Sequence, residues 1–366
     1  MLPENNQNER EYDVVVIGGG QAGLSVGYYL HRRTNLNYVI LDAQDKPGGA
    51  WLQGWNSLRL FSPAQWSSLP GWMFPGAPAR YPTRDEVIDY LTEYERRYKL
   101  PIERPVKVKA VRREAENLIV ESSTGNLKAK AVVSATGTWQ KPFIPFHPGQ
   151  NEFEGVQIHS AYYRSPEQFA GKTVLVVGGA NSGAQIMAEL SLFADAIWVT
   201  LDVPQFLPDD VDGRVLFDRA SEKYRSLVAG ACGTSSEQKP NDLLGNIVMV
   251  EPVRAARSRD ALQSRRPFVK FTKTGVVWEN GTETPVDAVV WCTGFKPVLD
   301  HLRPLDVVNE NGRIEVRGTH SIKEPRLWLV GYGEWTGFAS ATLVGVGRTA
   351  RKTVEEITAA LAPITT

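Results

Sequence analysis

Apolar and polar positions along the chain repeat one order of elements twice. Short apolar runs that end in glycine are typical of buried parallel strands, and the apolar spacing that follows each run is helical. Each block therefore predicts a strand, a helix and a second strand. The expected elements are 13–17, 21–31 and 38–41 in the first block, and 173–177, 182–193 and 197–200 in the second.

An antiparallel excursion is expected after each block. From 106 to 133 hydrophobicity alternates with period two around Thr124-Gly125-Asn126. Later, Asn280-Gly281 between the apolar runs 276–278 and 286–291 favours a hairpin turn. Both excursions return through a Thr-Gly pair. These pairs are Thr136-Gly137 and Thr293-Gly294.

Signals at helix ends complete the pattern. Thr83 with Glu86 three positions later forms a capping box, and apolar residues then fall on one helix face. That face is Val87, Leu91, Tyr94 and Tyr98. A last strand at 327–330 and a helix at 341–360 fit best as completion of the first block's sheet. The second block is therefore expected to be inserted into the first.

Composition indicates a folded globular protein of two ordinary domains, with 366 residues, 42% hydrophobic and 22% charged. The formal net charge is +0 and no basic run stands out, which excludes nucleic acid and anionic membranes as expected partners. The apolar stretch 14–30 contains five glycines and a glutamine. It is better interpreted as strand, turn and helix than as a membrane span.

Cysteine usage agrees with a reducing compartment. Cys232 and Cys292 form neither a CxxC pair nor part of a metal-ligand cluster. The polar stretch 1–13 lacks the basic-then-apolar order of a secretion signal. We therefore expect a cytoplasmic protein with no bound metal.

The first glycine turn has the features of a dinucleotide site. In Gly18-x-Gly20-x-x-Gly23 the glycines permit a tight turn, close approach of a pyrophosphate and close helix packing. The helix start, including Gln21 and Ala22, offers free N–H groups to phosphate. Asp42 lies 42 − 23 = 19 positions after the third glycine, where a carboxylate can hold ribose hydroxyls.

The second turn repeats this pattern with one change. Gly178-x-Ala180-x-x-Gly183 has alanine in the middle, and Asn181 and Ser182 begin the helix. Asp202 lies 202 − 183 = 19 positions after Gly183, so the equal offset predicts an equal role. A carboxylate there would repel a 2′-phosphate, and 200–210 contains no Arg or Lys. The sequence therefore predicts a preference for NADH over NADPH.

Two dinucleotide sites in one chain narrow the chemistry, because such enzymes commonly hold one nucleotide as a resident flavin and use the other as a hydride donor. We expect FAD at the first turn and a nicotinamide nucleotide at the second. The predicted fold class is α/β, with two Rossmann-like dinucleotide-binding domains, the second inserted into the first, each with an antiparallel β excursion.

The segment between the blocks carries a family fingerprint. Phe153, Gly155, His159 and Tyr163 fit the pattern FxGxxxHxxxY, in which the chain resembles the class B flavin-containing monooxygenases. Other similar segments are PGGAW (47–51), ATG (135–137), CTGF (292–295) and LPDDVDGRVLF (207–217). The chain looks most similar to short bacterial members that accept NADH or NADPH, and to flavin monooxygenases associated with arsenic resistance.

The resemblance implies an FAD-binding domain of 1–155 and 295–366 around an NAD(P)H-binding domain of 156–294. It implies that NAD(P)H reduces FAD and that dioxygen forms a C4a-(hydro)peroxyflavin. This adduct would oxygenate a soft nucleophile such as a sulfide, an amine or indole. A homodimer would be unsurprising for the family.

The resemblance also assigns residues. Those expected to contact the two cofactors, besides the glycine turns, are Gly49, Trp51, Thr136, Gly333, Thr293 and Gly294. The candidate catalytic residues are His159, Tyr163 and Arg59. His159 is expected to couple the two domains around the nicotinamide and not to act as a base.

One segment departs from the family. Members often carry a Thr-Asn pair near the flavin that is linked to handling the oxygen adduct, whereas 57–66 contains no asparagine. Arg59, Ser62 and Gln65 are the candidate substitutes, and a less stable adduct would increase uncoupled NAD(P)H oxidation. The aromatic-rich segment 51–72 is expected to form a wall that shields the adduct from water.

Other activities stay open at the level of sequence. A Baeyer–Villiger monooxygenase shares the chemistry, although its linker usually continues with Trp-Pro or Trp-Asp where Tyr163-Arg164 stands. Trivalent arsenicals are also soft enough to be oxidised. A disulfide oxidoreductase would need a redox-active cysteine pair. A nucleotide-binding redox sensor is the alternative from a different class, and it would need no oxygenation pocket.

Overall fold

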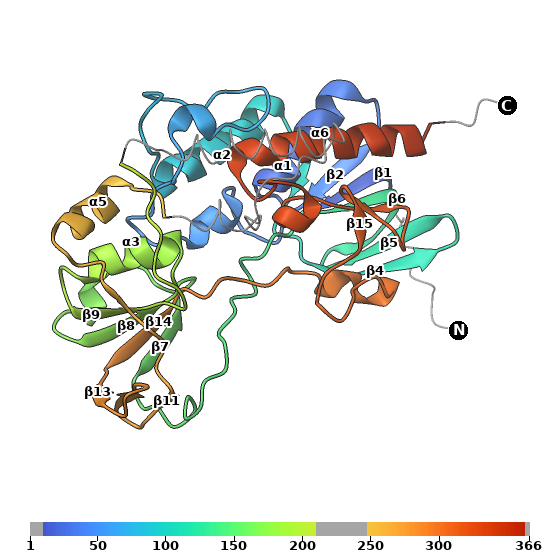
Figure 1. Cartoon of the computed structure of the whole chain (residues 1–366). Helices are drawn as coiled ribbons and strands as arrows, with labels where there is room; N and C mark the ends of the chain where they lie inside the picture. Colours follow the sequence, from blue (N-terminus) through green and yellow to red (C-terminus); the bar gives the residue numbers. More distant parts are fainter. Residues whose placement is uncertain (1–9, 210–246, 363–366) are drawn as a thin grey trace, which may run out of the picture.

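The computed structural model of the protein describes residues 10–209 and 247–362, whose strands form sheets of nine, five and three strands. The α-helices are α1 (Gln21–Arg33), α2 (Arg84–Tyr98), α3 (Asn181–Leu190), α5 (Glu251–Ser258) and α6 (Leu343–Ala360). The short 3-10 helices are η1 (Gly49–Gln53), η2 (Ala64–Trp66), η3 (Glu167–Phe169), η5 (Asp300–Leu305) and η6 (Glu334–Thr336). Figure 1 shows two lobes, one with α1, α2 and α6 and the other with α3 and α5.

The nine-stranded sheet forms the first lobe. Its strands are β1 (Arg10–Ile17), β2 (Tyr38–Leu41), β3 (Ile102–Glu103), β4 (Val108–Glu114), β5 (Asn117–Ser122), β6 (Gly125–Ser134), β15 (Val316–Arg317), β16 (His320–Ser321) and β17 (Leu327–Leu329). Strands β17, β6, β1, β2 and β3 are neighbours in that order and run parallel. Because both faces are covered, a strand such as β2 (YVIL) is apolar throughout and fully buried.

The five-stranded sheet forms the second lobe and is parallel throughout. Its strands are β7 (Val156–His159), β8 (Thr173–Val177), β9 (Asp195–Val199), β10 (Ser264–Arg265) and β14 (Ala288–Trp291), in the order β10-β9-β8-β14-β7. The small antiparallel sheet contains β11 (Lys270–Phe271), β12 (Gly275–Val277) and β13 (Glu283–Pro285). All of these strands lie in sequence between β6 and β15 of the first sheet.

The strand–helix–strand blocks predicted from the sequence are confirmed as β1-α1-β2 and β8-α3-β9. The capping box of α2 is also confirmed, since the Thr83 N–H donates to Glu86 Oε2 at 2.8 Å and the Glu86 N–H donates to Thr83 Oγ1 at 3.3 Å. The first antiparallel excursion is present as β4, β5 and β6. Helix α3 ends at Leu190, before the predicted 193.

The second predicted hairpin was wrong in one arm. β12 pairs through the Asn280-Gly281 turn with β13 only. The following apolar run becomes β14, which pairs in parallel with both β8 and β7 in the centre of the second sheet. A short apolar run does not reveal from sequence whether its partner is antiparallel and local or parallel and distant.

Two segments connect the lobes and pair with each other. The backbone N–H of Phe143 donates to the Gly294 carbonyl at 2.9 Å, that of Lys296 to Lys141 at 2.8 Å, and that of Val298 to Gly137 at 3.0 Å. The rings of Trp139 and Phe295 stack with centroids 4.8 Å apart. We name residues 137–143 and 294–298 together the connector.

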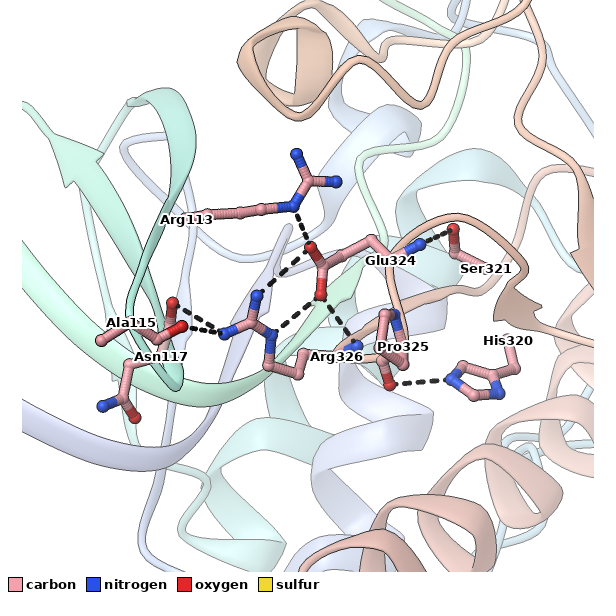
Figure 2. A network of polar contacts seen from close by, with 8 residues as sticks. All are labelled: Arg113, Ala115, Asn117, His320, Ser321, Glu324, Pro325 and Arg326. Carbon is pink, nitrogen blue, oxygen red and sulfur yellow. Dashed lines mark hydrogen bonds and ion pairs between the residues drawn. The ribbon is translucent and has the colours of Figure 1, made fainter.

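A buried carboxylate ties the β4–β5 hairpin to the segment before β17. Figure 2 shows Glu324 between two guanidinium groups, with Arg113 Nε 2.6 Å from Oε2 and Arg326 Nε 2.8 Å from Oε1. Arg326 also donates to the carbonyls of Ala115 and Asn117 at 3.0 and 3.1 Å. Burial opposes ionisation of Glu324, but the hydrogen bonds from Arg326 and Arg113 outweigh it and lower its pKa.

No helix among residues 10–209 and 247–362 combines the length and the apolar character needed to cross a bilayer.

We expect Glu324→Gln to lower the free energy of unfolding by about 2 kcal/mol at pH 7, because it weakens charge-assisted hydrogen bonds at a buried site. Since the pKa of Glu324 is lowered from 4.5, the stabilisation is fully present above pH 4.5 and declines below it. Urea unfolding at pH 7 and pH 4 measures both effects. Glu315→Gln at an exposed position is the matched control, and an equal loss in both variants would contradict the assignment.

Candidate functional site

The first glycine of each turn lies against the residue that directly follows the return strand of the same sheet, β6 in the first and β14 in the second. Gly18 has φ +111° and a Cβ there would lie 2.5 Å from the Ala135 carbonyl oxygen. Gly178 has φ +136° and a Cβ there would lie 2.3 Å from the Cys292 carbonyl oxygen. Both turns therefore use backbone conformation and space that only glycine provides.

The third glycines let each helix begin against the end of its strand. A Cβ on Gly23 would lie 1.8 Å from the Gly18 carbonyl oxygen, and a Cβ on Gly183 would lie 2.1 Å from that of Gly178. These contacts leave no room for a methyl group. The close packing of helix start on strand end is therefore the same in both lobes.

The middle positions are the N-caps of the two helices and leave them open to an anion. Gly20 caps α1 and Ala180 caps α3, and neither helix has a side-chain cap or an acid in its first turn. Free N–H groups and the positive end of the helix dipole therefore point outward at both turns. A Cβ on Gly20 would meet only the Gly49 Cα, at 3.8 Å. Both turns fit a bound pyrophosphate.

Predicted residues around the first turn are brought together. Gln21 Nε2 donates to the Ala341 carbonyl at 2.6 Å, and Gln21 Oε1 accepts from Trp51 Nε1 at 3.1 Å. Gly49 has φ +54°, and a Cβ there would lie 2.8 Å from the Gly20 Cα. Ala22 is buried and lies against Gly331, where a Cβ would be 2.6 Å from that of Ala22. Gly49 and Trp51 of the PGGAW segment therefore lie against the first glycine turn.

Thr136 belongs to a buried polar network that sequence reasoning missed. Thr136 Oγ1 lies 2.7 Å from the Tyr332 hydroxyl, which also lies 2.6 Å from Ser134 Oγ. Ser134 Oγ in turn contacts His301 Nε2 at 3.0 Å. Tyr332 precedes Gly333, which has φ +87° and where a Cβ would meet no atom within 4 Å. The network fixes the end of β6 against the turn that follows β17.

Asp42 directly follows β2 and is paired, with only 4% of the residue exposed. Arg104, which directly follows β3, donates to its Oδ2 from Nε at 3.1 Å and from Nη2 at 3.0 Å. Arg104 also donates to Glu95 at 2.7 and 2.8 Å. Burial raises the pKa of Glu95, although Arg104 opposes the shift. Sequence reasoning missed Arg104 because it lies 62 positions from Asp42.

Asp202 does not occupy the position that Asp42 has in the first lobe. It is the third residue after β9 and is exposed, whereas Thr200 directly follows the strand and is buried. A Cβ on Gly179 would touch the Thr200 side chain at 3.4 Å, just as a Cβ on Gly19 would meet Asp42. The helical connection is shorter in the second lobe than in the first. β9 ends 199 − 183 = 16 positions after Gly183, whereas β2 ends 41 − 23 = 18 positions after Gly23. Equal offset therefore does not mean equal position.

Of the other residues predicted for the second site, Asn181, Thr293 and Gly294 have backbone partners. Asn181 Oδ1 accepts from the Val248 N–H at 2.9 Å, and Ser182 is half-buried beside it. Thr293 Oγ1 donates to the Phe143 carbonyl at 2.5 Å, and the Gly294 carbonyl accepts from the Phe143 N–H. Thr293 therefore joins the end of the second sheet to the connector, which begins its second segment at Gly294.

His159 has both ring nitrogens engaged and is 1% exposed. Nδ1 accepts from the Ala161 N–H at 3.1 Å, so the proton lies on Nε2, which donates to the Gly294 carbonyl at 2.9 Å. Burial lowers the pKa of His159, although the bond to Gly294 opposes the shift. A neutral imidazole with two backbone partners fits a coupling role and leaves no nitrogen free to act as a base.

Tyr163 and Arg59 also have partners of their own. Tyr163 is completely buried and its hydroxyl donates to Glu189 Oε2 at 2.8 Å, so burial raises the pKa of that hydroxyl. Arg59 is half-buried and its Nη1 donates to the Tyr81 carbonyl at 3.3 Å. The three candidate catalytic side chains thus each bind a different part of the chain.

The aromatic-rich segment contacts both lobes. Trp55 packs in one apolar cluster with Tyr163 of the second lobe, whereas Leu60 and Leu69 pack in the core of the first. Arg164 adds polar contacts, since its Nη1 donates to the Gln53 carbonyl at 2.9 Å. The fingerprint segment is therefore docked on the aromatic-rich segment.

Trp66 has an unsatisfied donor in the segment that departs from the family. Across residues 10–209 and 247–362, its Nε1 is the single buried side-chain nitrogen or oxygen without a hydrogen-bond partner. Such a group is costly unless something accepts from it. Of the predicted substitutes for the missing asparagine, Ser62 is already bonded to Ser67 Oγ at 2.8 Å, and Gln65 is exposed. Sequence reasoning placed Trp66 only in the aromatic wall.

Cysteine and metal chemistry receive no support within the described part of the chain. Cys292 is a buried free thiol, and burial raises its pKa to about 12. Residues 10–209 and 247–362 contain no group of three or more His, Cys, Asp or Glu side chains arranged to hold a metal ion. Cys232 and residues 210–217 of LPDDVDGRVLF lie outside the described residues.

We expect His301 to make stability depend on pH. Burial lowers its pKa from 6.5 to about 4, so the unfolded chain binds the proton more readily and stability falls as pH drops below 6.5. Between pH 7 and pH 5 the loss should be about 2 kcal/mol. Denaturant unfolding of the wild type and His301→Gln at both pH values measures it. If the difference between the two proteins is the same at both pH values, this origin is excluded.

Comparison with known proteins agrees with this geometry. The model of the pyridine nucleotide-disulphide oxidoreductase family matches residues 15–202. The structure of a flavin-containing monooxygenase from Stenotrophomonas maltophilia is similar with a TM-score of 0.87 and 48% identity, over 96% of this chain and 100% of that one. An uncharacterized CzcO-like oxidoreductase of Geobacillus kaustophilus is 31% identical over 94% of this chain and 98% of that protein.

A probable indole-3-pyruvate monooxygenase of Arabidopsis thaliana, YUCCA4, is 27% identical over 94% of this chain and 89% of that protein. Together these similarities establish an α/β dinucleotide-binding flavoprotein that uses FAD and a pyridine nucleotide. They confirm the resemblance found in the fingerprint. The chain belongs to the pyridine nucleotide-disulphide oxidoreductase family and, within it, to the class B flavin monooxygenases.

Proposed function

We propose that the protein is a monooxygenase that transfers one oxygen atom from dioxygen to small soft nucleophiles such as sulfides, amines or indole. FAD is held by 1–155 with 295–366, and the nicotinamide nucleotide by 156–294. The observation that carries the proposal is the matched pair of glycine turns, each with an uncapped helix at the end of a parallel strand. The first turn binds FAD as a resident cofactor, and the second binds the nicotinamide nucleotide, which dissociates after each catalytic cycle.

In the first lobe the chain's own groups fit an adenosine diphosphate moiety. The free N–H groups of α1 face the pyrophosphate, and Asp42 accepts from ribose hydroxyls while Arg104 holds its carboxylate in place. FAD, when bound, supplies the two-electron chemistry and the activation of dioxygen.

In the second lobe the groups at α3 hold the coenzyme, and the connector sets how the lobes face each other. His159 fixes the carbonyl of Gly294, which is also paired with Phe143. The aromatic-rich segment excludes water from between the lobes because Trp55 packs into the second core and Leu60 into the first. The free Trp66 N–H offers a hydrogen bond to a bound group.

The two turns can be told apart by matched substitutions. We expect Gly20→Val to yield colourless protein, because a branched side chain blocks the approach of the FAD pyrophosphate to α1. Ala180→Val should stay yellow while its KM for NADH rises roughly tenfold, equivalent to about 1.4 kcal/mol. The visible spectrum and steady-state KM measure these outcomes, and each variant is the control for the other. The reverse pattern would contradict the assignment of the cofactors.

The preference for NADH over NADPH stays a prediction, since Asp202 lies beyond the strand end and is exposed. Its carboxylate still adds negative charge near the coenzyme ribose. We expect Asp202→Ser to raise kcat/KM for NADPH by about threefold, less than a full ion-pair effect because the site is exposed to solvent. The value for NADH should change little. An unchanged ratio of the two would show that Asp202 has no part in coenzyme choice.

Oxygen transfer is tested by product analysis. The purified protein is reduced with NADH under nitrogen, which should bleach its flavin absorbance. It is then mixed with ¹⁸O₂ and methyl phenyl sulfide, and labelled sulfoxide is compared with NADH consumed. Labelled sulfoxide supports the proposal. If hydrogen peroxide is the sole product with a sulfide, an amine and indole, the protein is an oxidase. If the reduced protein converts cyclohexanone to its cyclic ester, it is a Baeyer–Villiger enzyme. If NADH does not bleach the flavin absorbance, the protein is a sensor.

A further inference from the structure

The strand beside β9 delivers an arginine to the same edge as the second glycine turn. Arg265 of β10 pairs with Val199, the last residue of β9, in the register in which Glu103 of β3 pairs with Leu41, the last residue of β2. The residues that directly follow β10 and β3 are Arg266 and Arg104. The two arginines therefore have equivalent positions in the two sheets.

Hydrogen bonds fix this edge. The Thr200 N–H donates to the Arg265 carbonyl at 3.0 Å, and Thr200 Oγ1 donates to Ser264 Oγ at 3.0 Å. The Arg266 guanidinium donates to the carbonyl of Leu201, the residue between Thr200 and Asp202. Arg266 thus lies at the end of β9, although it is 266 − 202 = 64 positions from Asp202.

The partners of the two arginines differ. Arg104 is neutralised by Asp42 and Glu95, both buried carboxylates, so it orients Asp42 and is not free for an anion. Arg266 contacts a neutral carbonyl and is exposed. Thr200 has the position in the second lobe that Asp42 has in the first. Because Thr200 carries no carboxylate, it does not compete with a phosphate for the Arg266 guanidinium.

Space and further positive charge adjoin Arg266. An open hollow of about 480 Å³ is lined by both Arg265 and Arg266, with Glu279 as the acidic group on its wall. The Arg265 guanidinium lies 5.4 Å from the centre of the Trp278 ring, which holds it at the rim. Arginine is the side chain best shaped to bind phosphate, through two parallel N–H groups.

In a βαβ nucleotide site the pyrophosphate lies at the helix start and the adenosine ribose at the end of the second strand. A 2′-phosphate on that ribose would therefore project at the end of β9. We propose that Arg266 binds the 2′-phosphate of NADPH and allows the enzyme to use NADPH alongside NADH. This inference rests on the proposed assignment of the nicotinamide nucleotide to the second turn. Arg266 offsets the repulsion that Asp202 exerts on the same phosphate.

Kinetics of Arg266→Gln test the proposal. We expect its KM for NADPH to rise about tenfold, because one charge-assisted contact is lost. Its KM for NADH should stay within about twofold of the wild-type value. The kcat with either coenzyme should stay the same, because the contact is remote from the reacting atoms. Arg313→Gln, an exposed arginine in the first lobe, is the matched control and should change neither KM. A purely structural effect would raise both KM values together.

Binding of fragments separates this inference from the proposed function, because it needs no turnover. By isothermal titration calorimetry, Arg266→Gln should bind 2′,5′-ADP about tenfold more weakly than the wild type does, and should bind 5′-ADP as tightly as the wild type does. If Arg266→Gln binds 2′,5′-ADP as tightly as the wild type does, or loses affinity for both fragments equally, the role of Arg266 is overturned. If Arg266→Gln loses affinity for 2′,5′-ADP alone but the wild type never oxygenates a substrate, only the proposed function is contradicted.

Discussion

Both nucleotide turns depend on a contact between backbone atoms that tolerates no side chain. At Gly23 and Gly183 the helix begins so close to the strand end that a Cβ would overlap a carbonyl oxygen, at 1.8 and 2.1 Å. This approach brings the free N–H groups of α1 and α3 to the carboxyl edge of each sheet. The capacity to bind an anion and the position of the ribose contacts follow from these two turns.

The connector and the fingerprint segment hold the two lobes, each with its glycine turn, in one arrangement. Phe143 and Gly294 pair across the connector, and His159 holds the same Gly294 carbonyl from the second sheet. The aromatic-rich segment packs against both lobes, with Trp55 in the apolar core of the second and Leu60 in that of the first. The proposed oxygenation requires that water be excluded, because water that reaches a reactive oxygen species diverts it to peroxide. In the proposed enzyme, the same part of the chain would therefore hold the two lobes together and exclude water from between them.

Much of the fold could be predicted from the sequence where the signal is local. The two blocks, the Thr83 capping box and the first antiparallel excursion depend on residues within a few positions of each other, and all are present. β14 was misplaced because a four-residue apolar strand carries no record of its partners. Its neighbours β7 and β8 lie more than a hundred positions earlier.

The site shows the same limit. The glycine turns are local patterns and could be predicted from the sequence. Arg104 and Arg266 reach the site through parallel pairing of strands that are distant in sequence, and His301 reaches it through a buried contact with Ser134. Thr200 was hidden for a different reason, because counting residues from Gly183 assumes that the two helical connections have one length.

The most direct measurement is a crystal structure of the purified enzyme with NADP⁺ added. We expect FAD with its pyrophosphate at the start of α1 and its ribose on Asp42, and the added coenzyme with its pyrophosphate at the start of α3. FAD at α3, or a second turn that remains closed to the coenzyme, would contradict the division of the two nucleotides between the two lobes.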